Sequence, residues 1–295
     1  YQTLVGSLPA GVLDAEGWAA YAGRVEAAML KSAREAKVST SWLQPDAAYE
    51  AALGGFVRAL LEPRESNLFV PDLVATARVF AWWGALSGIA LAALKTLSPG
   101  VPDFYQGHET IELSLVDPDN RRPVDYGRRR AMLADAEALA ALPAAAARAA
   151  ALGDWLAAAP DGRAKFWTVH AALQLRRRDE ALFAQGGYLA LEASGSKAPH
   201  VVAFARRAGD RLAWVVAPRL VATAGGEVGV PPLGAFWGDT AIAWPAREGP
   251  CPWAVGTRLV DAFGGGGVTL GADARIALAD LCRVWPVAAL TAAPA

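Results

Sequence analysis

SPGVPDFYQGHETIELSLVDPDNRRPVDY, residues 98–126, follows a long apolar segment and gathers carboxylates, arginines, an amide and aromatic rings. Pro99 and Gly100 are predicted to end a helix that begins near Pro71. Val101–Tyr105 predicts a short strand, and the polar residues after it predict a loop. A helix, a short strand and a polar loop, in that order, are typical of the last repeat of a (β/α)8 barrel, in which loops after strands carry the chemistry.

The polar loop has the composition of a sugar-binding surface. Aromatic rings stack on the C–H faces of pyranoses, while Asp, Asn, Gln and Arg hydrogen-bond to hydroxyl groups. Asp117 and Asp119 lie two residues apart, which separates their α-carbons by about 6.6 Å in an extended segment. That spacing suits both a retaining and an inverting pair of glycosidase carboxylates. The alternative is that both carboxylates pair with Arg121 and Arg122 and stiffen the loop.

Three separated blocks carry a resemblance to a known family. PGVPDFYQGHE (residues 99–109) and SLVDPDNRRPVDY (residues 114–126) resemble the eighth-strand region of the maltooligosyltrehalose synthases, members of the α-amylase superfamily. KSAREAKVSTSWLQPDAAYEAAL (residues 31–53) resembles a second family segment. HAALQLRRRDEALFAQGGYLALE (residues 170–192) resembles the passage into the family's C-terminal domain. Because the blocks stand in the expected order, the resemblance covers nearly the whole chain.

The resemblance implies an α+β fold that forms the C-terminal portion of a longer enzyme. Residues 1–180 would supply the last helices and the eighth strand of a partial (β/α)8 barrel, with helical insertions. Residues 181–295 would form an antiparallel β-sandwich domain. The family's nucleophilic Asp, acid/base Glu and third Asp lie N-terminal to everything present here. We therefore assign no catalytic residue, and we expect the isolated chain to be inactive and to self-associate.

By the same resemblance, the enzyme converts the reducing-end α-1,4 bond of a maltooligosaccharide into an α,α-1,1 bond by intramolecular transglucosylation, without a cofactor. Its implied partners are the maltooligosaccharide and the missing N-terminal part of the same enzyme. The candidate substrate-binding residues come from two blocks: Lys37, Thr40, Trp42, Tyr105, Gln106, Glu109, Asp117, Asp119, Asn120, Arg121 and Arg122. Two alternatives stay open, namely a non-catalytic α-glucan-binding module and part of an α-amylase-type hydrolase.

Composition limits the other function classes. The 295 residues carry a net charge of −1, so no basic surface is expected for nucleic acid. The uncharged apolar run from Val79 to Leu94 has sixteen residues, fewer than the roughly 20 that span a bilayer. The three histidines are too scattered for a local metal cluster. Cys251 and Cys282 lie outside metal and redox motifs, and free thiols favour a cytoplasmic location.

Hydrophobic spacing and end signals predict the helices. The first covers about residues 14–37, and the second begins after an N-cap at Asp46 and ends at Pro63. The alanine-rich residues 128–159 favour helix, with predicted breaks at Pro143 and Gly153. A further helix is predicted over Arg163–Arg178.

The last third of the chain predicts antiparallel strands separated by turns. Ala208-Gly209-Asp210 is predicted to be the turn of a hairpin. The predicted strands are Tyr188–Glu192, His200–Arg206, Leu212–Pro218, Thr257–Asp261, Gly267–Leu270 and Cys282–Ala288.

Overall fold

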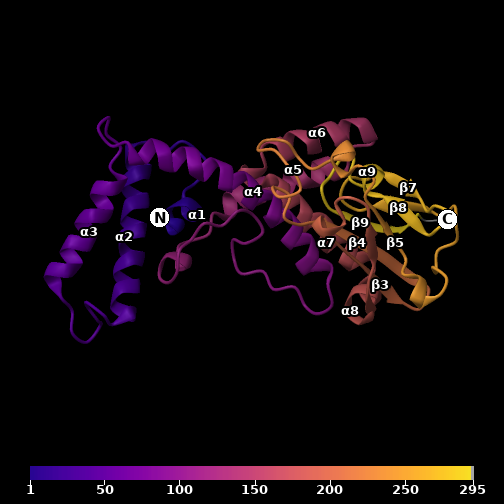
Figure 1. Cartoon of the computed structure of the whole chain (residues 1–295), viewed down its shortest axis with the longest axis horizontal. Coiled ribbons are helices and arrows are strands. Elements are labelled where there is room, and N and C mark those ends of the chain that lie inside the picture. Colours follow the sequence, from indigo (N-terminus) through magenta and orange to yellow (C-terminus); the bar gives the residue numbers. More distant parts are fainter. Residues whose placement is uncertain (294–295) are drawn as a thin grey trace. The chain divides into compact units, whose positions relative to one another are not determined.

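The computed structural model describes residues 1–293 and divides into two compact units (Figure 1). The first unit consists of Tyr1–Ala81 with Glu112–Val124. The second consists of Trp82–Ile111 with Asp125–Ala295. The polar loop is therefore shared between the units. The predicted domain boundary at residue 180 lies inside the second unit and stays a prediction for the longer protein.

The first unit is helical. Its helices are α1 (Gln2–Ser7), α2 (Ala15–Ala36), α3 (Ala47–Leu61), the first part of α4 (Phe69–Leu97) and the short 3-10 turn η1 (Asp119–Arg121). The side chain of Asp14 accepts a hydrogen bond from the Gly17 amide at 2.8 Å, and that of Asp46 accepts one from Tyr49 at 2.9 Å. Side-chain oxygens at these positions satisfy amides that have no partner in the first turn. Both predicted helices are thus confirmed.

The core of the first unit lies between these helices. It is formed by buried aromatic and aliphatic side chains, including Trp18, Tyr21, Val25, Val57 and Leu61. These residues recur at helical spacing on α2 and α3, so one face of each helix is buried and the other carries charge.

Within the described residues, the second unit contains the rest of α4 and five further α-helices. They are α5 (Tyr126–Ala140), α6 (Ala145–Ala157), α7 (Arg163–Arg178), α8 (Glu180–Gln185) and α9 (Leu278–Leu281). The break at Pro143 and the bounds of α7 are confirmed. The predicted break at Gly153 is wrong, because this residue lies inside α6. One helical glycine costs only about 1 kcal/mol, and burial of Leu152 and Leu156 on either side offsets that cost.

Two antiparallel sheets complete the second unit. The six-stranded sheet has the order β1-β3-β4-β9-β6-β7, and the three-stranded sheet has the order β2-β5-β8. The strands are β1 (Gly187–Ala190), β2 (Glu192–Ser194), β3 (Val201–Ala208), β4 (Arg211–Pro218), β5 (Ala241–Ala243), β6 (Arg258–Asp261), β7 (Gly267–Thr269), β8 (Arg275–Ala277) and β9 (Ala288–Ala292). The hairpin at Ala208-Gly209-Asp210 joins β3 to β4, as predicted, with Gly209 at a φ of 59°.

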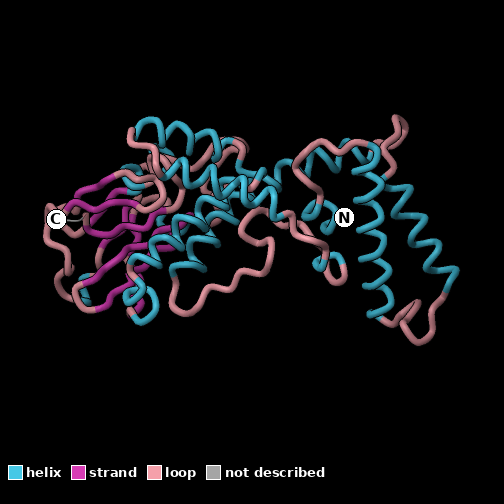
Figure 2. Tube along the Cα trace, turned by 180° about the vertical axis from the view of Figure 1, so that it is seen from behind, coloured by secondary structure: helices cyan, strands magenta, loops and turns pink. Residues whose placement is uncertain are grey.

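The central strand β4 shows how the layers are held together. Its side chains alternate between two hydrophobic clusters, as the two-residue period of a strand requires. Ala213 and Val215 face the helices, whereas Trp214 and Val216 face the three-stranded sheet. Figure 2 shows the strands of this unit gathered in one block beside its helices. The predicted antiparallel arrangement is confirmed, and helices cover the other face of the larger sheet.

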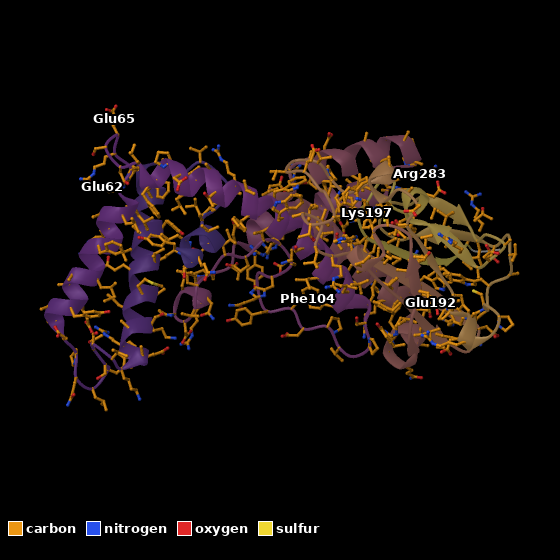
Figure 3. All side chains as sticks on the ribbon, viewed as in Figure 1. Glu62, Glu65, Phe104, Glu192, Lys197 and Arg283 are labelled. Carbon is orange, nitrogen blue, oxygen red and sulfur yellow. The ribbon has the colours of Figure 1, made fainter. Side chains whose placement is uncertain are left out.

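Two strand predictions are wrong, and the predicted strand Tyr188–Glu192 is divided between β1 and β2, which belong to different sheets. Residues 282–287 form turns after α9, and the strand begins only at Ala288. Pro286 cannot donate a hydrogen bond to a neighbouring strand, which explains the late start. Val101–Tyr105 forms no strand, and Val101 is 93% exposed. Lys95 Nζ instead donates to the Asp103 carbonyl at 2.7 Å and lies 3.8 Å from the centre of the Phe104 ring. Phe104 is labelled on this loop in Figure 3.

The missing eighth strand has a physical cause. A strand needs the amides and carbonyls of a neighbouring strand, and the described strands all lie C-terminal to Gly186 and pair with one another. The (β/α)8 barrel therefore stays a prediction for the longer protein.

Helix α4 links the two units and is longer than the predicted apolar run. Of the helices in residues 1–293, it has the length and composition that would let it cross a membrane. Core helices meet the same criterion, and Ile89, Ala93 and Leu97 are fully buried in the core of the second unit. Burial of these residues accounts for the apolar composition of α4.

Candidate functional site

The structure places the predicted sugar-binding residues in two groups. Lys37, Thr40, Trp42, Asp117, Asp119, Asn120, Arg121 and Arg122 belong to the first unit, and Tyr105, Gln106 and Glu109 belong to the second. Each group is built from its own contacts, and their roles in binding stay predictions.

The loop between α2 and α3 is organised around one carboxylate. Glu50 Oε1 accepts hydrogen bonds from Arg34 Nε at 2.8 Å and from Thr40 Oγ1 at 2.7 Å, and Glu50 Oε2 accepts one from Arg34 Nη2 at 2.5 Å. Thr40 Oγ1 in turn accepts the Asp46 amide at 3.0 Å. The hydrogen bonds from Arg34, and then that from Thr40, lower the pKa of Glu50 to about 2. This carboxylate therefore stays ionised and holds the loop.

The three predicted residues of this loop differ in what they offer a ligand. Thr40 is buried, with its hydroxyl already engaged by Glu50 and Asp46. Trp42 is 56% exposed and carries the Arg34 guanidinium 4.8 Å from the centre of its ring. Lys37 is exposed and ends α2 in a left-handed conformation, with a φ of 55°. Trp42 and Lys37 thus present an aromatic ring and an ammonium donor to solvent.

Asp119 is engaged by the protein on both oxygens. Arg24 Nε donates to Oδ1 at 2.9 Å and Arg24 Nη2 donates to Oδ2 at 2.9 Å, while the Leu115 amide donates to Oδ2 at 2.7 Å. Arg122 Nε lies 2.8 Å from Oδ1. Burial opposes ionisation, but the hydrogen bonds from Arg24 and Leu115, with the charges of Arg24 and Arg122, outweigh it and lower the pKa of Asp119. These contacts fix the loop to helix α2.

The rest of this loop is more exposed. Arg121 Nη2 pairs with Asp117 Oδ2 at 2.5 Å, one turn away along the chain. Arg122 also donates to Ser114 Oγ at 3.2 Å. Asn120 lies exposed on η1. Both loop carboxylates are therefore in ion pairs with arginines, as the alternative interpretation of the loop anticipates.

The second group lies on the loop after α4. Tyr105 is 46% exposed, and its ring meets that of His108 edge to face at 5.5 Å between centroids. Gln106 is exposed. Glu109 pairs with Arg129, whose Nη2 also donates to the Gly107 carbonyl at 2.9 Å. Tyr105 and Gln106 are available to a ligand, while Glu109 orders the loop.

Four residues essential to this geometry were not among the predicted site residues. They are Arg24, Arg34, Glu50 and Arg129, and each holds a predicted residue in place. Arg34 and Glu50 stand inside the block at residues 31–53, so their position there was the available signal. Arg24 carried no such signal, because its partner lies ninety-five residues away.

Among residues 1–293, no group of three or more His, Cys, Asp and Glu side chains is placed to hold a metal ion. A cavity of about 610 Å³ lies in the second unit, lined by residues that include Asp261, Thr269 and Arg275. Burial raises the pKa of Asp261 to about 6, although the Ala289 and Gly264 amides donate to its carboxylate. None of the predicted sugar-binding residues lines this cavity.

Comparison with known proteins gives the relatives of the chain. No family model matches it. Two curated proteins of Mycobacterium tuberculosis, from strains CDC 1551 and H37Rv, are named maltooligosyl trehalose synthase and are 37% identical over 251 residues. That alignment covers 83% of this chain and 28% of each relative. The chain thus spans less than a third of the curated relatives it matches.

Solved structures of maltooligosyltrehalose synthases also match the chain. A mutant of maltooligosyltrehalose synthase from Arthrobacter ramosus is 31% identical, with a TM-score of 0.71, over 99% of this chain and 32% of that one. A further maltooligosyl trehalose synthase shares the fold, with a TM-score of 0.68 at 22% identity. The chain is therefore a homologue of the maltooligosyltrehalose synthases and matches the C-terminal part of these proteins.

Proposed function

We propose that the chain is the C-terminal portion of an enzyme that converts the reducing-end α-1,4 linkage of a maltooligosaccharide into an α,α-1,1 linkage. The observation that carries the proposal is the similarity to the Arthrobacter ramosus synthase, at 31% identity across 99% of the chain. The chain covers only 32% of that protein. The activity of the whole enzyme is thus proposed for a longer polypeptide, of which this chain forms one part.

The chemistry is an intramolecular transglucosylation. An Asp supplied by the N-terminal part attacks the anomeric carbon and forms a glycosyl-enzyme, while a Glu protonates the departing glucose. The released glucose then turns, and its anomeric hydroxyl attacks the same carbon as the Glu takes back the proton. Water must be excluded while the glucose turns, because hydrolysis would otherwise compete.

This chain contributes binding groups to that reaction. Trp42 and Tyr105 are exposed enough to stack on pyranose rings, and Lys37 and Gln106 supply donors for hydroxyl groups. The carboxylates of Glu109, Asp117 and Asp119 are engaged by arginines. We therefore give these three carboxylates an ordering role in the loops, and no acid or base role in the chemistry.

The test uses the isolated chain and the intact protein side by side. Each is incubated with maltohexaose, and the anomeric protons are followed by NMR. We expect the intact protein to remove the reducing-end signal and to create an α,α-1,1 signal, and the isolated chain to change nothing. New reducing ends from the intact protein would support an α-amylase-type hydrolase instead. Binding without any product would support a non-catalytic glucan-binding module.

A further inference from the structure

One face of the Trp42 indole ring is covered by the Arg34 guanidinium. The Arg34 guanidinium lies 4.8 Å from its ring centre, yet the residue remains 56% exposed. A guanidinium over an indole face is attracted by the ring's quadrupole. The ring is thus held from the protein side and remains accessible from solvent.

Arg34 is itself fixed by Glu50. Two parallel hydrogen bonds, at 2.8 Å and 2.5 Å, join the guanidinium to the carboxylate, and this forked geometry allows one orientation of both groups. The Glu50 side chain is only 13% exposed. Through Thr40, the same carboxylate also holds the loop backbone at Asp46. One carboxylate therefore sets both the path of the loop and the support beneath Trp42.

We propose that Arg34 and Glu50 are positioning residues, which hold Trp42 as a one-sided stacking platform for a pyranose ring of the α-glucan substrate. This inference rests on the proposed function, from which it takes the class of ligand. Arg34 and Glu50 touch no sugar in it and act only through the indole ring.

Ordering the Trp42 ring before binding should strengthen sugar affinity by an amount that can be estimated. A free tryptophan on an exposed loop would lose rotamer freedom when a sugar stacks on it, and ordering one such side chain weakens affinity by about two- to tenfold. A ring ordered before binding avoids this loss. The low pKa of Glu50 supports the same role, because the carboxylate keeps its charge at any pH at which the enzyme would act.

The experiment is a double-mutant cycle in the intact protein, with maltohexaose as substrate. We expect Trp42→Ala to raise KM about tenfold and Glu50→Gln to raise it about two- to tenfold, with kcat nearly unchanged in both. In the double variant, loss of Glu50 should add nothing to loss of Trp42, because it acts only through the ring. Arg34→Lys keeps the positive charge but loses the two parallel hydrogen bonds to Glu50, and it should raise KM as Glu50→Gln does.

Glu26→Gln is the matched control. Glu26 pairs with Arg58 between the same two helices, away from the loop, so this variant removes an ion pair between α2 and α3 and should leave KM unchanged. If Glu50→Gln fails to fold, Arg34→Lys carries the cycle.

The outcomes separate the inference from the proposed function. No effect of Trp42→Ala on KM would remove the proposed sugar contact and the inference together. A raised KM in Trp42→Ala with an unchanged KM in Glu50→Gln, or multiplied effects in the double variant, would overturn only the positioning role. Failure of the intact protein to form the α,α-1,1 product would overturn the proposed function itself.

Discussion

Arg206 offers the sharpest test of how the second unit is held together. The residue lies on β3 and is 1% exposed. Its guanidinium donates to carbonyls at the C-terminal ends of two helices: Nη1 to Leu97 of α4 at 2.9 Å, and Nη2 to Phe183 of α8 at 3.1 Å. It also donates to Gly186 at 2.7 Å and Gly187 at 3.2 Å. The last carbonyls of a helix, such as those of Leu97 and Phe183, have no donor within the helix, and a cation near them complements the helix dipole.

Arg206→Met keeps an unbranched apolar stem and removes all donors. The four carbonyls named above would lose this donor, at about 1 kcal/mol each or more, which sums to about 4 kcal/mol. A fifth carbonyl, that of Leu182 at 3.5 Å, keeps the hydrogen bond from the Gly186 amide. Part of this loss is offset because methionine needs no desolvation, and burial is the main cause of the lowered pKa of Arg206. We therefore expect the free energy of unfolding to fall by about 2–4 kcal/mol.

Urea unfolding of the chain, followed by far-ultraviolet circular dichroism at one protein concentration for all variants, measures the loss. Arg207→Met is the matched control, because Arg207 is the next residue on β3, is exposed and donates only to the Gly209 carbonyl at 3.3 Å. Its variant should stay within about 0.5 kcal/mol of the parent. Arg206→Lys replaces the guanidinium with an ammonium group. Its free energy of unfolding should fall between those of Arg206→Met and Arg207→Met. Equal losses in Arg206→Met and Arg207→Met would show that the hydrogen bonds of Arg206 do not hold the two helices to β3.

Two further predictions concern carboxylates, one buried (Asp261) and one partly buried (Asp119). Burial raises the pKa of Asp261 from 3.8 to about 6, so the folded state binds the proton more tightly, and the free energy of unfolding should fall by up to about 3 kcal/mol as pH rises through that interval. Asp261→Asn should abolish this dependence. If the difference in urea midpoint between this variant and the parent stays constant between pH 4 and 7, the prediction is wrong. Asp119→Asn should lower the free energy of unfolding by about 2 kcal/mol, because Arg24 loses its charged partner. A raised KM at unchanged stability would instead assign Asp119 to sugar binding.

The helices were predictable because their signals are local. Asp14 and Asp46 cap helices whose first amides lie three residues away, and Pro63 and Pro143 interrupt helices by their own geometry. Strands depend on distant partners. The segment Val101–Tyr105 has the composition of a strand but no neighbour to pair with, and the three strands of the smaller sheet are only three residues long.

The residues of the candidate site show the same difference between local and distant signals. Residue type and motif position drew attention to Trp42 and Tyr105, and both are exposed. The ion pair between Arg24 and Asp119 joins residues ninety-five positions apart, and no local pattern encodes such a contact. Sequence therefore located the loops but could not separate side chains that face solvent from those that hold the loop in shape.

The proposed function is tested most directly by the product that the intact protein forms from maltohexaose, observed by NMR at the anomeric protons. We expect loss of the reducing-end signal together with a new α,α-1,1 signal, and no change with the isolated chain. Turnover by the isolated chain would contradict it, because the carboxylates that we place in ion pairs would then include the catalytic ones.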